Sequence, residues 1–232
     1  MRAVIRGTGM YVPPNVVDNH RLAVLMDTSD EWIRKRSGIV TRHYASPDQA
    51  TSDLAVPAAQ RALEDAGVEA SEIDYVVFAT MTPDYYFPGA APIFKRKLGL
   101  CTIPCLDIRQ QCSGFLYGLQ LADALVRSGA SRNVLLIGAE VHGGFMPYKD
   151  WDVVLGRSKA KVSPEEFKRN TLFRDRLVLF GDGAGAFVVS GDDSDERGIE
   201  SVRAHADGKY ADKLWVDGGG SAYRHYFEPR MY

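Results

Sequence analysis

Strand-like and helix-like patterns alternate through most of the chain. Near-continuous apolar runs rich in β-branched residues predict strands buried on both faces. These strands and shorter extended stretches are expected at Ala3–Ile5, Ile73–Thr80, Pro104–Ile108 and Asn133–Ala139. Apolar residues spaced for one helical face, followed by a glycine, predict helices at Thr51–Ala66 and Gly114–Ser128. A cap, early acids, late bases and a final glycine predict a helix at Thr28–Gly38, and Pro92–Leu98 before Gly99 is also expected to be helical. This order predicts an α/β fold with a largely parallel sheet.

The later part of the chain predicts further strands at Leu177–Phe180, Ala186–Ser190 and Ile199–His205. Between the last two lies the most polar, turn-rich stretch, Gly191–Gly198, and we expect a domain boundary there. The first domain would span residues 1–192, and 193–232 would begin a second.

Lys149–Asp175 interrupts this alternation with a polar, charged stretch. Within it, Ser163-Pro-Glu-Glu166 has a capping residue, a proline and two acids in the order that begins a helix. We therefore predict an inserted loop that carries one short helix. It would be either a solvated surface feature or a lid or partner contact.

Composition narrows the class of protein. The 232 residues are 45% hydrophobic and 25% charged, with a net charge of -2, as in ordinary globular proteins. This balance gives no reason to expect a nucleic acid or an anionic membrane as partner. No apolar run approaches membrane-spanning length, and the first residues lack the apolar core of a signal peptide, so we expect a cytoplasmic location.

The chain has three cysteines, Cys101, Cys105 and Cys112. An odd number without an export signal predicts free thiols in a reducing compartment. Their spacing does not match a zinc pattern, and no paired cysteine–histidine set lies nearby, so we expect no metal. Cys101 and Cys105 are expected to be small buried apolar residues.

Cys112 is the leading candidate for chemistry. It follows a short apolar stretch and directly precedes Ser113, Gly114 and an amphipathic helix. The partial positive charge of a helix N-terminus stabilises a thiolate, the nucleophilic form of cysteine. Small residues beside it let a substrate carbonyl approach and leave helix amides free for an oxyanion. The alternative is a buried structural cysteine, which the local pattern alone leaves open.

Two other patterns suggest ligands less directly. Trp32 with Arg34, Lys35 and Arg36 could stack on a purine and pair with phosphate, or could be a buried indole followed by a solvated basic turn. Gly181-Asp-Gly-Ala-Gly185 matches neither phosphate-loop pattern, and we interpret it as close backbone packing. Any of the five histidines could be a base for Cys112, but none lies in a recognisable pairing motif.

Several segments together resemble β-ketoacyl-acyl-carrier-protein synthase III of the thiolase superfamily. They are Gly7-Thr-Gly-Met-Tyr-Val-Pro13, Thr28-Ser-Asp-Glu-Trp-Ile-Arg-Lys-Arg-Ser-Gly-Ile39, Ala79-Thr-Met-Thr-Pro-Asp84, Cys112-Ser-Gly-Phe115, Phe180-Gly-Asp-Gly-Ala-Gly-Ala186 and His205-Ala-Asp-Gly208. The similarity covers nearly the whole chain apart from Lys149–Asp175. It implies an αβαβα sandwich built from two similar halves, of which this chain holds the first and the start of the second.

The resemblance also implies an activity and its residues. Cys112 would take an acyl group from acyl-CoA, and malonyl-acyl-carrier protein would then decarboxylate and attack the thioester. The enzyme would be a homodimer and would need no cofactor. The expected substrate-binding residues are Trp32 and Arg36 at the CoA entrance with Thr28 nearby, Phe87 at the dimer contact and acyl pocket, and Arg174 as a CoA contact.

The chain also departs from the family. Synthase III enzymes use a His in a His-Gln-Ala-Asn motif and an Asn in a Gly-Asn-Thr motif for condensation, and neither motif occurs here. We therefore expect the N-terminal part of a longer enzyme. Two alternatives stay open: an acyltransferase that passes the acyl group to another acceptor without decarboxylation, and a non-catalytic dimerisation fragment.

Overall fold

In the computed structural model, the described residues are 1–194, 198–214, 216 and 220–222. They divide into two units, Met1–Val202 and Arg203–Tyr232. In the second unit, the described part holds one 3-10 turn, η4 (Gly208–Tyr210), capped by the Asp207 side chain. His225 and the last residues of the chain lie outside the described residues. The position of the domain boundary stays a prediction.

The first unit is built on a five-stranded mixed sheet with the order β1-β7-β6-β4-β5. Its strands are β1 (Arg2–Tyr11), β4 (Tyr75–Ala79), β5 (Cys105–Ile108), β6 (Asn133–Glu140) and β7 (Gly183–Asp192). β4 pairs in parallel with both β5 and β6, whereas β7 runs antiparallel to β6 and β1. The expectation of a largely parallel sheet therefore holds for β1, β4, β5 and β6, which run in the same direction, and only β7 runs back between β6 and β1.

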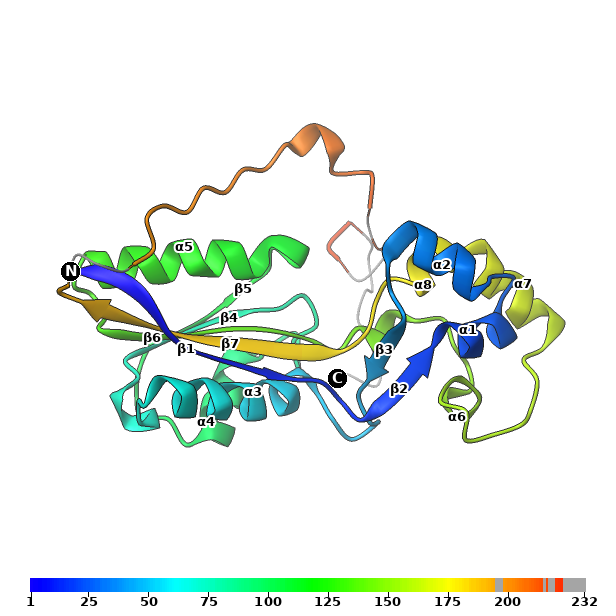
Figure 1. Cartoon of the computed structure of the whole chain (residues 1–232), viewed down its shortest axis with the longest axis horizontal. Coiled ribbons are helices and arrows are strands. Elements are labelled where there is room, and N and C mark those ends of the chain that lie inside the picture. Colours follow the sequence, from blue (N-terminus) through cyan, green and yellow to red (C-terminus); the bar gives the residue numbers. More distant parts are fainter. Residues whose placement is uncertain (195–197, 215, 217–219, 223–232) are drawn as a thin grey trace. The chain divides into compact units, whose positions relative to one another are not determined.

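Helices cover both faces of this sheet (Figure 1). The helices α3 (Thr51–Ala66) and α4 (Ala91–Leu98) lie on one face, and α5 (Gly114–Arg127) lies on the other. Each face has its own apolar core, with Phe78 and Leu135 in the first and Val77 and Leu136 in the second. Alternate residues of β4 and β6 thus point to opposite cores, which explains why both strands read as continuous apolar runs.

The glycines at the start of the chain let α3 approach β1 closely. A Cβ on Gly7 would lie 2.3 Å from the Ala66 nitrogen, and one on Gly9 would lie 2.1 Å from the Ala58 oxygen. Backbone atoms cannot yield that much, so only glycine fits at these two positions.

A smaller lobe packs beyond one end of the sheet. It contains the two-stranded sheet of β2 (Asn15–Asp18) and β3 (Thr41–Tyr44), and the helices α1 (Asn19–Leu25), α2 (Asp30–Ser37), α6 (Trp151–Val154), α7 (Pro164–Leu172) and α8 (Arg174–Leu177). The core of this lobe joins its early helices to its late ones: Leu22 of α1 and Ile33 of α2 pack with Val153 and Val154 of α6 and Leu177 of α8.

The segment 149–175 differs from the single short helix that we expected. It contains α6 and α7 and the start of α8, and Val153 and Val154 of α6 are buried in one core with residues of α1 and α2, whereas Leu172 stays 75% exposed. The helix start at Ser163 is confirmed, because its side chain accepts a hydrogen bond from the Glu166 amide. A purely solvated surface feature is therefore ruled out for this segment.

Two of the predicted strands are absent. Leu177 ends α8, and the amides of Leu177 and Val178 donate to Phe173 and Arg174 as in a helix. Their side chains fill the lobe core, so the apolar run reflects burial rather than a strand. Ile199–His205 is not a strand either: the Ile199 amide donates to the Ala3 carbonyl at 2.8 Å, but no ladder follows.

The remaining predicted helices lie close to where the sequence places them. α3 has the expected bounds, and α2, α3 and α4 each end at a glycine in the left-handed conformation. No described helix is long and apolar enough to span a membrane. The structure describes three short 3-10 turns in this unit besides the helices: η1 (Ala70–Glu72), η2 (Gln111–Ser113) and η3 (His142–Phe145).

Candidate active site

Cys112 lies where the sequence predicts, at the entry to a helix. It belongs to η2, which follows β5 and leads directly into Gly114, the first residue of α5. Its side chain is exposed and free of a disulfide. The alternative of a buried structural cysteine is therefore wrong for this residue.

The backbone around Cys112 is shaped for this exposure. Gln111 has φ of 43°, and within the described part of the chain it is the single non-glycine residue with a positive φ. A left-handed conformation costs such a residue about 1 kcal/mol. On the other side, Gly114 and Gly118 let α5 approach the sheet, since a Cβ on Gly118 would lie 2.4 Å from Leu136 Cδ1. No side chain caps the start of this helix.

Cys101 and Cys105 are less buried than expected. Cys101 is exposed, and Cys105 is half-buried beside the α3–α4 core. β5 is a sheet edge and the loop before it faces solvent, so neither thiol is fully covered.

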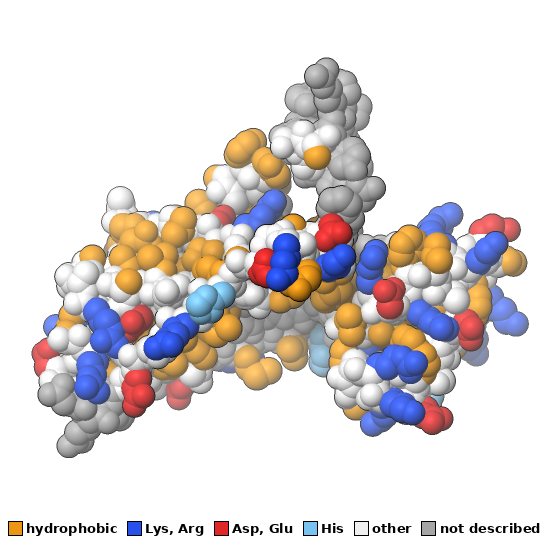
Figure 2. Space-filling view, turned by 90° about the horizontal axis from the view of Figure 1, so that it is seen from above, with side chains coloured by type: hydrophobic (Ala, Val, Ile, Leu, Met, Phe, Trp, Pro, Cys, Tyr) orange, Lys and Arg blue, Asp and Glu red, His pale blue; other side chains and the backbone are white. Residues whose placement is uncertain are grey.

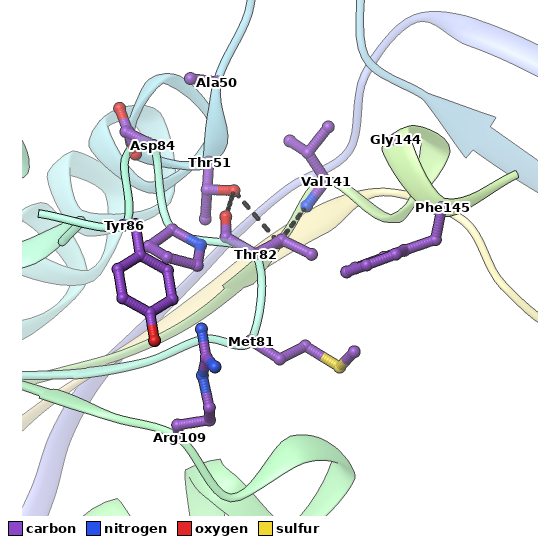
Figure 3. A pocket seen from close by; sticks show the side chains of 11 residues that line it. Ala50, Thr51, Met81, Thr82, Asp84, Tyr86, Arg109, Val141, Gly144 and Phe145 are labelled. Atoms are coloured by element: carbon purple, nitrogen blue, oxygen red, sulfur yellow. Dashed lines mark hydrogen bonds between the residues drawn. The ribbon is translucent and has the colours of Figure 1, made fainter. Parts of the chain in front are cut away.

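Figure 3 shows a pocket of about 400 Å³ that Arg109, three residues before Cys112, helps to line, although Cys112 itself is not among the lining residues. The pocket walls include Met81 and Tyr86 from the segment after β4, Arg109 from the loop before Cys112, and Phe145 from η3. The Arg109 guanidinium carbon lies 6.0 Å from the Tyr86 ring centroid. The Tyr86 ring in turn meets the Phe87 ring edge-on at 5.0 Å. This chain of contacts joins the predicted dimer residue to the Cys112 loop.

Two half-buried carboxylates hold the loops around this pocket. Glu140, at the end of β6, accepts hydrogen bonds from the Met81 amide at 2.8 Å and from the Thr82 hydroxyl at 2.5 Å. Asp107, in β5, accepts from the amides of Ala90 and Ala91 at 2.8 Å each. Burial raises the pKa of both carboxyl groups, although these hydrogen bonds oppose the shift. Sequence reasoning missed both residues, because each is a lone acid at a strand end.

The second predicted group gathers around Trp32 on α2. The Ser29 side chain caps this helix by accepting from the Trp32 amide at 3.1 Å. Arg36 lies over the indole, with its guanidinium carbon 4.2 Å from the ring centroid, and Arg174 lies 4.9 Å from the same ring. The structure therefore brings Trp32, Arg36 and Arg174 together, even though Arg174 belongs to the inserted segment and lies far from the other two in sequence.

The side chains around Trp32, Arg36 and Arg174 do not cover them, so these three could contact a ligand. Arg34 pairs with Asp30 at 2.8 Å and, with Asn19, lowers the pKa of the Asp30 carboxyl. The Thr28 hydroxyl is buried and has no hydrogen-bond partner among the described residues. Trp32 is half-buried and Arg36 is exposed. An aromatic ring with two cations suits a purine ring and phosphates.

Not all predicted site residues meet. Phe87 is 77% exposed, and within the described chain no hydrogen bond or ring contact joins Cys112 to the Trp32 cluster. Of the histidines, His142 stacks on Phe180 with centroids 4.2 Å apart, and burial lowers its pKa. His43 Nδ1 contacts the Pro13 carbonyl at 2.5 Å. Neither has a recorded contact with Cys112.

In the glycine run at the start of β7, one position is closely packed against neighbouring backbone. A Cβ on Gly181 would lie 3.0 Å from the His43 carbonyl oxygen, whereas Gly183 and Gly185 have ordinary room. Asp182 accepts from the amides of Ala45 and Gly143 at 2.7 and 2.9 Å, which ties this turn to two neighbouring loops. Close packing is thus confirmed for Gly181 alone among these three glycines.

Comparison with known proteins gives one consistent family. The 3-oxoacyl-[acyl-carrier-protein] synthase III family matches residues 106–156, which include Cys112. A β-ketoacyl-[acyl-carrier-protein] synthase III of Rhodospirillum rubrum is 45% identical over 226 residues, 95% of this chain and 63% of that protein. The enzyme of the same name from Cereibacter sphaeroides is 44% identical over 225 residues, 95% of this chain and 62% of that protein.

Solved structures agree with the sequence comparison. The synthase III of Thermus thermophilus superposes with a TM-score of 0.76 and 34% identity, over 92% of this chain and 59% of that one. The chain thus spans about three fifths of the length of the curated relatives it matches. In sequence and fold, the chain is a homologue of β-ketoacyl-[acyl-carrier-protein] synthase III with a thiolase-like α/β structure.

Proposed function

We propose that the complete natural polypeptide containing this chain is a condensing acyltransferase of the synthase III type. The observation that carries the proposal is the exposed Cys112 thiol at the entry to α5, in the segment that the family match covers. Helix amides beside a thiolate favour both the nucleophile and the oxyanion that forms when it attacks a thioester.

The reaction has two stages. The Cys112 thiolate adds to the carbonyl of an acyl-CoA, and the CoA thiolate leaves and takes up a proton. The malonyl group of malonyl-acyl-carrier protein then loses CO2, and the resulting carbanion attacks the Cys112 thioester. A carbon–carbon bond forms, and the Cys112 thiolate is released. The resemblance assigns the second stage to a His and an Asn whose motifs this chain does not contain.

The Trp32 cluster is the proposed entrance for CoA. Basic side chains gather on the lobe that carries α2 and α7, at the right of the view in Figure 2. Trp32 would stack on the adenine, and Arg36 and Arg174 would meet phosphates. We propose that acyl-CoA enters as a substrate and that no separate cofactor or metal takes part.

We further propose a cytoplasmic homodimer. β5 is an edge strand, and Leu106 on it is 40% exposed, beside a loop that exposes Tyr85 and Phe87. An edge strand with apolar neighbours is a ready surface for a second copy. Sedimentation equilibrium of the complete polypeptide should give twice the chain mass, and a monomer at micromolar concentration would contradict the proposal.

The test of the condensing activity is release of labelled CO2 from malonyl-acyl-carrier protein. We expect release that requires an acyl-CoA and is lost in Cys112→Ala. Acylation of Cys112 without CO2 release would favour transfer to another acceptor. Absence of acylation would favour the non-catalytic alternative.

A further inference from the structure

The segment 149–175 is joined to the short loop between α1 and α2 by side chains of α7 and α8. The loop consists of Met26, Asp27, Thr28 and Ser29, and it leads directly into the helix that carries Trp32 and Arg36. Whatever fixes this loop therefore fixes the proposed CoA entrance. The inference below rests on the proposed function.

Hydrogen bonds from the segment hold the last carbonyl of α1 and both backbone groups of Asp27 in this loop. Asn170 Nδ2 donates to the Leu25 carbonyl at 3.1 Å. Thr171 Oγ1 accepts from the Asp27 amide at 2.9 Å. Arg174 donates to the Asp27 carbonyl at 2.5 Å. These groups would otherwise end α1 without a fixed direction for the chain that follows.

α7 is itself well anchored, so it can act as a support. Asn170 is fully buried. Glu166 on the same helix is also buried, and it accepts from the Lys149 amide at 3.1 Å. Arg169 donates to the Pro147 carbonyl at 2.5 Å. Hydrogen bonds thus tie α7 to the backbone of Pro147 and Lys149 on one side and to the backbone of Leu25 and Asp27 on the other.

Apolar packing also joins the segment 149–175 to the end of α1 and the loop that follows it. Met26 and Leu25 are fully buried in the lobe core together with Val153 and Val154 of α6. Arg21 on α1 also donates to the Val154 carbonyl at 3.3 Å. The segment therefore contacts the α1–α2 loop at Met26 and at the Asp27 backbone, and on the next helix Trp32 is half-buried and Arg36 is exposed.

We propose that α7 positions the CoA entrance, with Asn170 and Thr171 as positioning residues that act through the backbone of Leu25–Asp27. They touch no substrate. Their effect is to hold Thr28 and the start of α2 so that Trp32 and Arg174 present a fixed surface to the nucleotide end of CoA. The segment 149–175 thus determines how well a thioester is recognised by its CoA portion, and it leaves the chemistry at Cys112 unchanged.

The test compares two thioesters of the same acyl group in the complete natural polypeptide. One is the acyl-CoA, and the other is the N-acetylcysteamine thioester, which lacks the nucleotide. Thr171→Val removes the acceptor for the Asp27 amide in a partly buried site and keeps the side-chain shape. We expect KM for the acyl-CoA to rise about fivefold, the effect of one lost hydrogen bond, with kcat for Cys112 acylation unchanged. Kinetics with the N-acetylcysteamine thioester should not change.

Two further variants complete the design. Thr171→Ser keeps the hydroxyl and should restore the wild-type KM. Lys168→Ala removes an exposed cation from the same helix and should have no effect on KM. If Lys168→Ala raised KM as much as Thr171→Val, the segment would act by charge, and the positioning proposal would be overturned.

The outcomes separate this inference from the proposed function. An equal loss with both thioesters, or no change with either, would overturn the positioning role while acylation itself stands. A wild-type protein that is acylated by neither thioester would instead overturn the proposed function and this inference with it. Asn170→Ala serves as a second probe once urea unfolding shows that the variant is folded.

Discussion

The guanidinium group of Arg174 lies over the indole of Trp32, with 4.9 Å between the guanidinium carbon and the ring centroid. The carbonyl of Asp27 and its carboxylate, 3.6 Å away, hold the arginine in that place. This contact brings the end of the inserted segment to the helix that the family resemblance marks as the CoA entrance. The resemblance alone could not settle the position of Arg174, because the insertion made its alignment ambiguous.

Replacing Arg174 by alanine should weaken CoA binding specifically. The variant loses a cation beside the aromatic ring and a donor for phosphate, together about 1–2 kcal/mol, so we expect KM for acyl-CoA to rise roughly 5- to 30-fold. Arg176→Ala is the matched control, since Arg176 is an exposed arginine of the same short helix that lies near Phe173 instead. Equal effects in steady-state kinetics of the two variants would refute the assignment.

Gly7→Ala should destabilise the fold strongly. The new Cβ would fall 2.3 Å from the Ala66 nitrogen in α3, and because backbone must shift, we expect a loss of about 1–3 kcal/mol or more in unfolding free energy. Gly144→Ala is the control, because a Cβ there meets nothing within 4 Å. Urea unfolding measures both. A Gly7→Ala protein as stable as Gly144→Ala would show that β1 and α3 are not so close.

Asp107→Asn should alter how stability depends on pH. Burial raises the pKa of the Asp107 carboxyl above its ordinary value, so the folded protein binds this proton more tightly than the unfolded chain. The contribution of Asp107 to stability is therefore largest at low pH, and it falls as pH rises from about 4 through the raised pKa. Asparagine does not titrate, so the variant should lack this fall.

The measurement for this prediction is the difference in unfolding free energy between wild type and Asp107→Asn over a series of pH values. We expect the difference, wild type minus variant, to decrease as pH rises and then to level off. Asp123→Asn is a suitable control, because Asp123 pairs with Arg127 on the surface of α5. A difference that rises with pH would contradict the direction assigned to Asp107.

Much of the fold could be predicted because local signals and tertiary environment agree. α3 begins at Thr51 and ends at Ala66 as expected, since its apolar face meets the sheet and Gly67 adopts the left-handed conformation that stops it. The strand expected at Leu177–Phe180 failed for the opposite reason. Four apolar residues fit either a short buried strand or a helix end, and only the lobe core decides between them.

The candidate site was predictable in part. Cys112 could be singled out because small residues and a helix follow it, and the structure exposes it there. The residues that hold the surrounding loops in place could not be predicted from local sequence patterns. Asp107 and Glu140 act on loops that the fold brings to them, and Thr171 acts on Asp27 across a contact distant in sequence. No local pattern encodes such partners.

The most direct test of the account is the intact mass of the complete polypeptide before and after incubation with a mixture of acyl-CoAs. Cys112→Ala and Cys101→Ala are compared with wild type, because both thiols are exposed. We predict a gain equal to one acyl group in wild type and in Cys101→Ala, and none in Cys112→Ala. An acyl gain that persists in Cys112→Ala would contradict the assignment of Cys112 as the nucleophile.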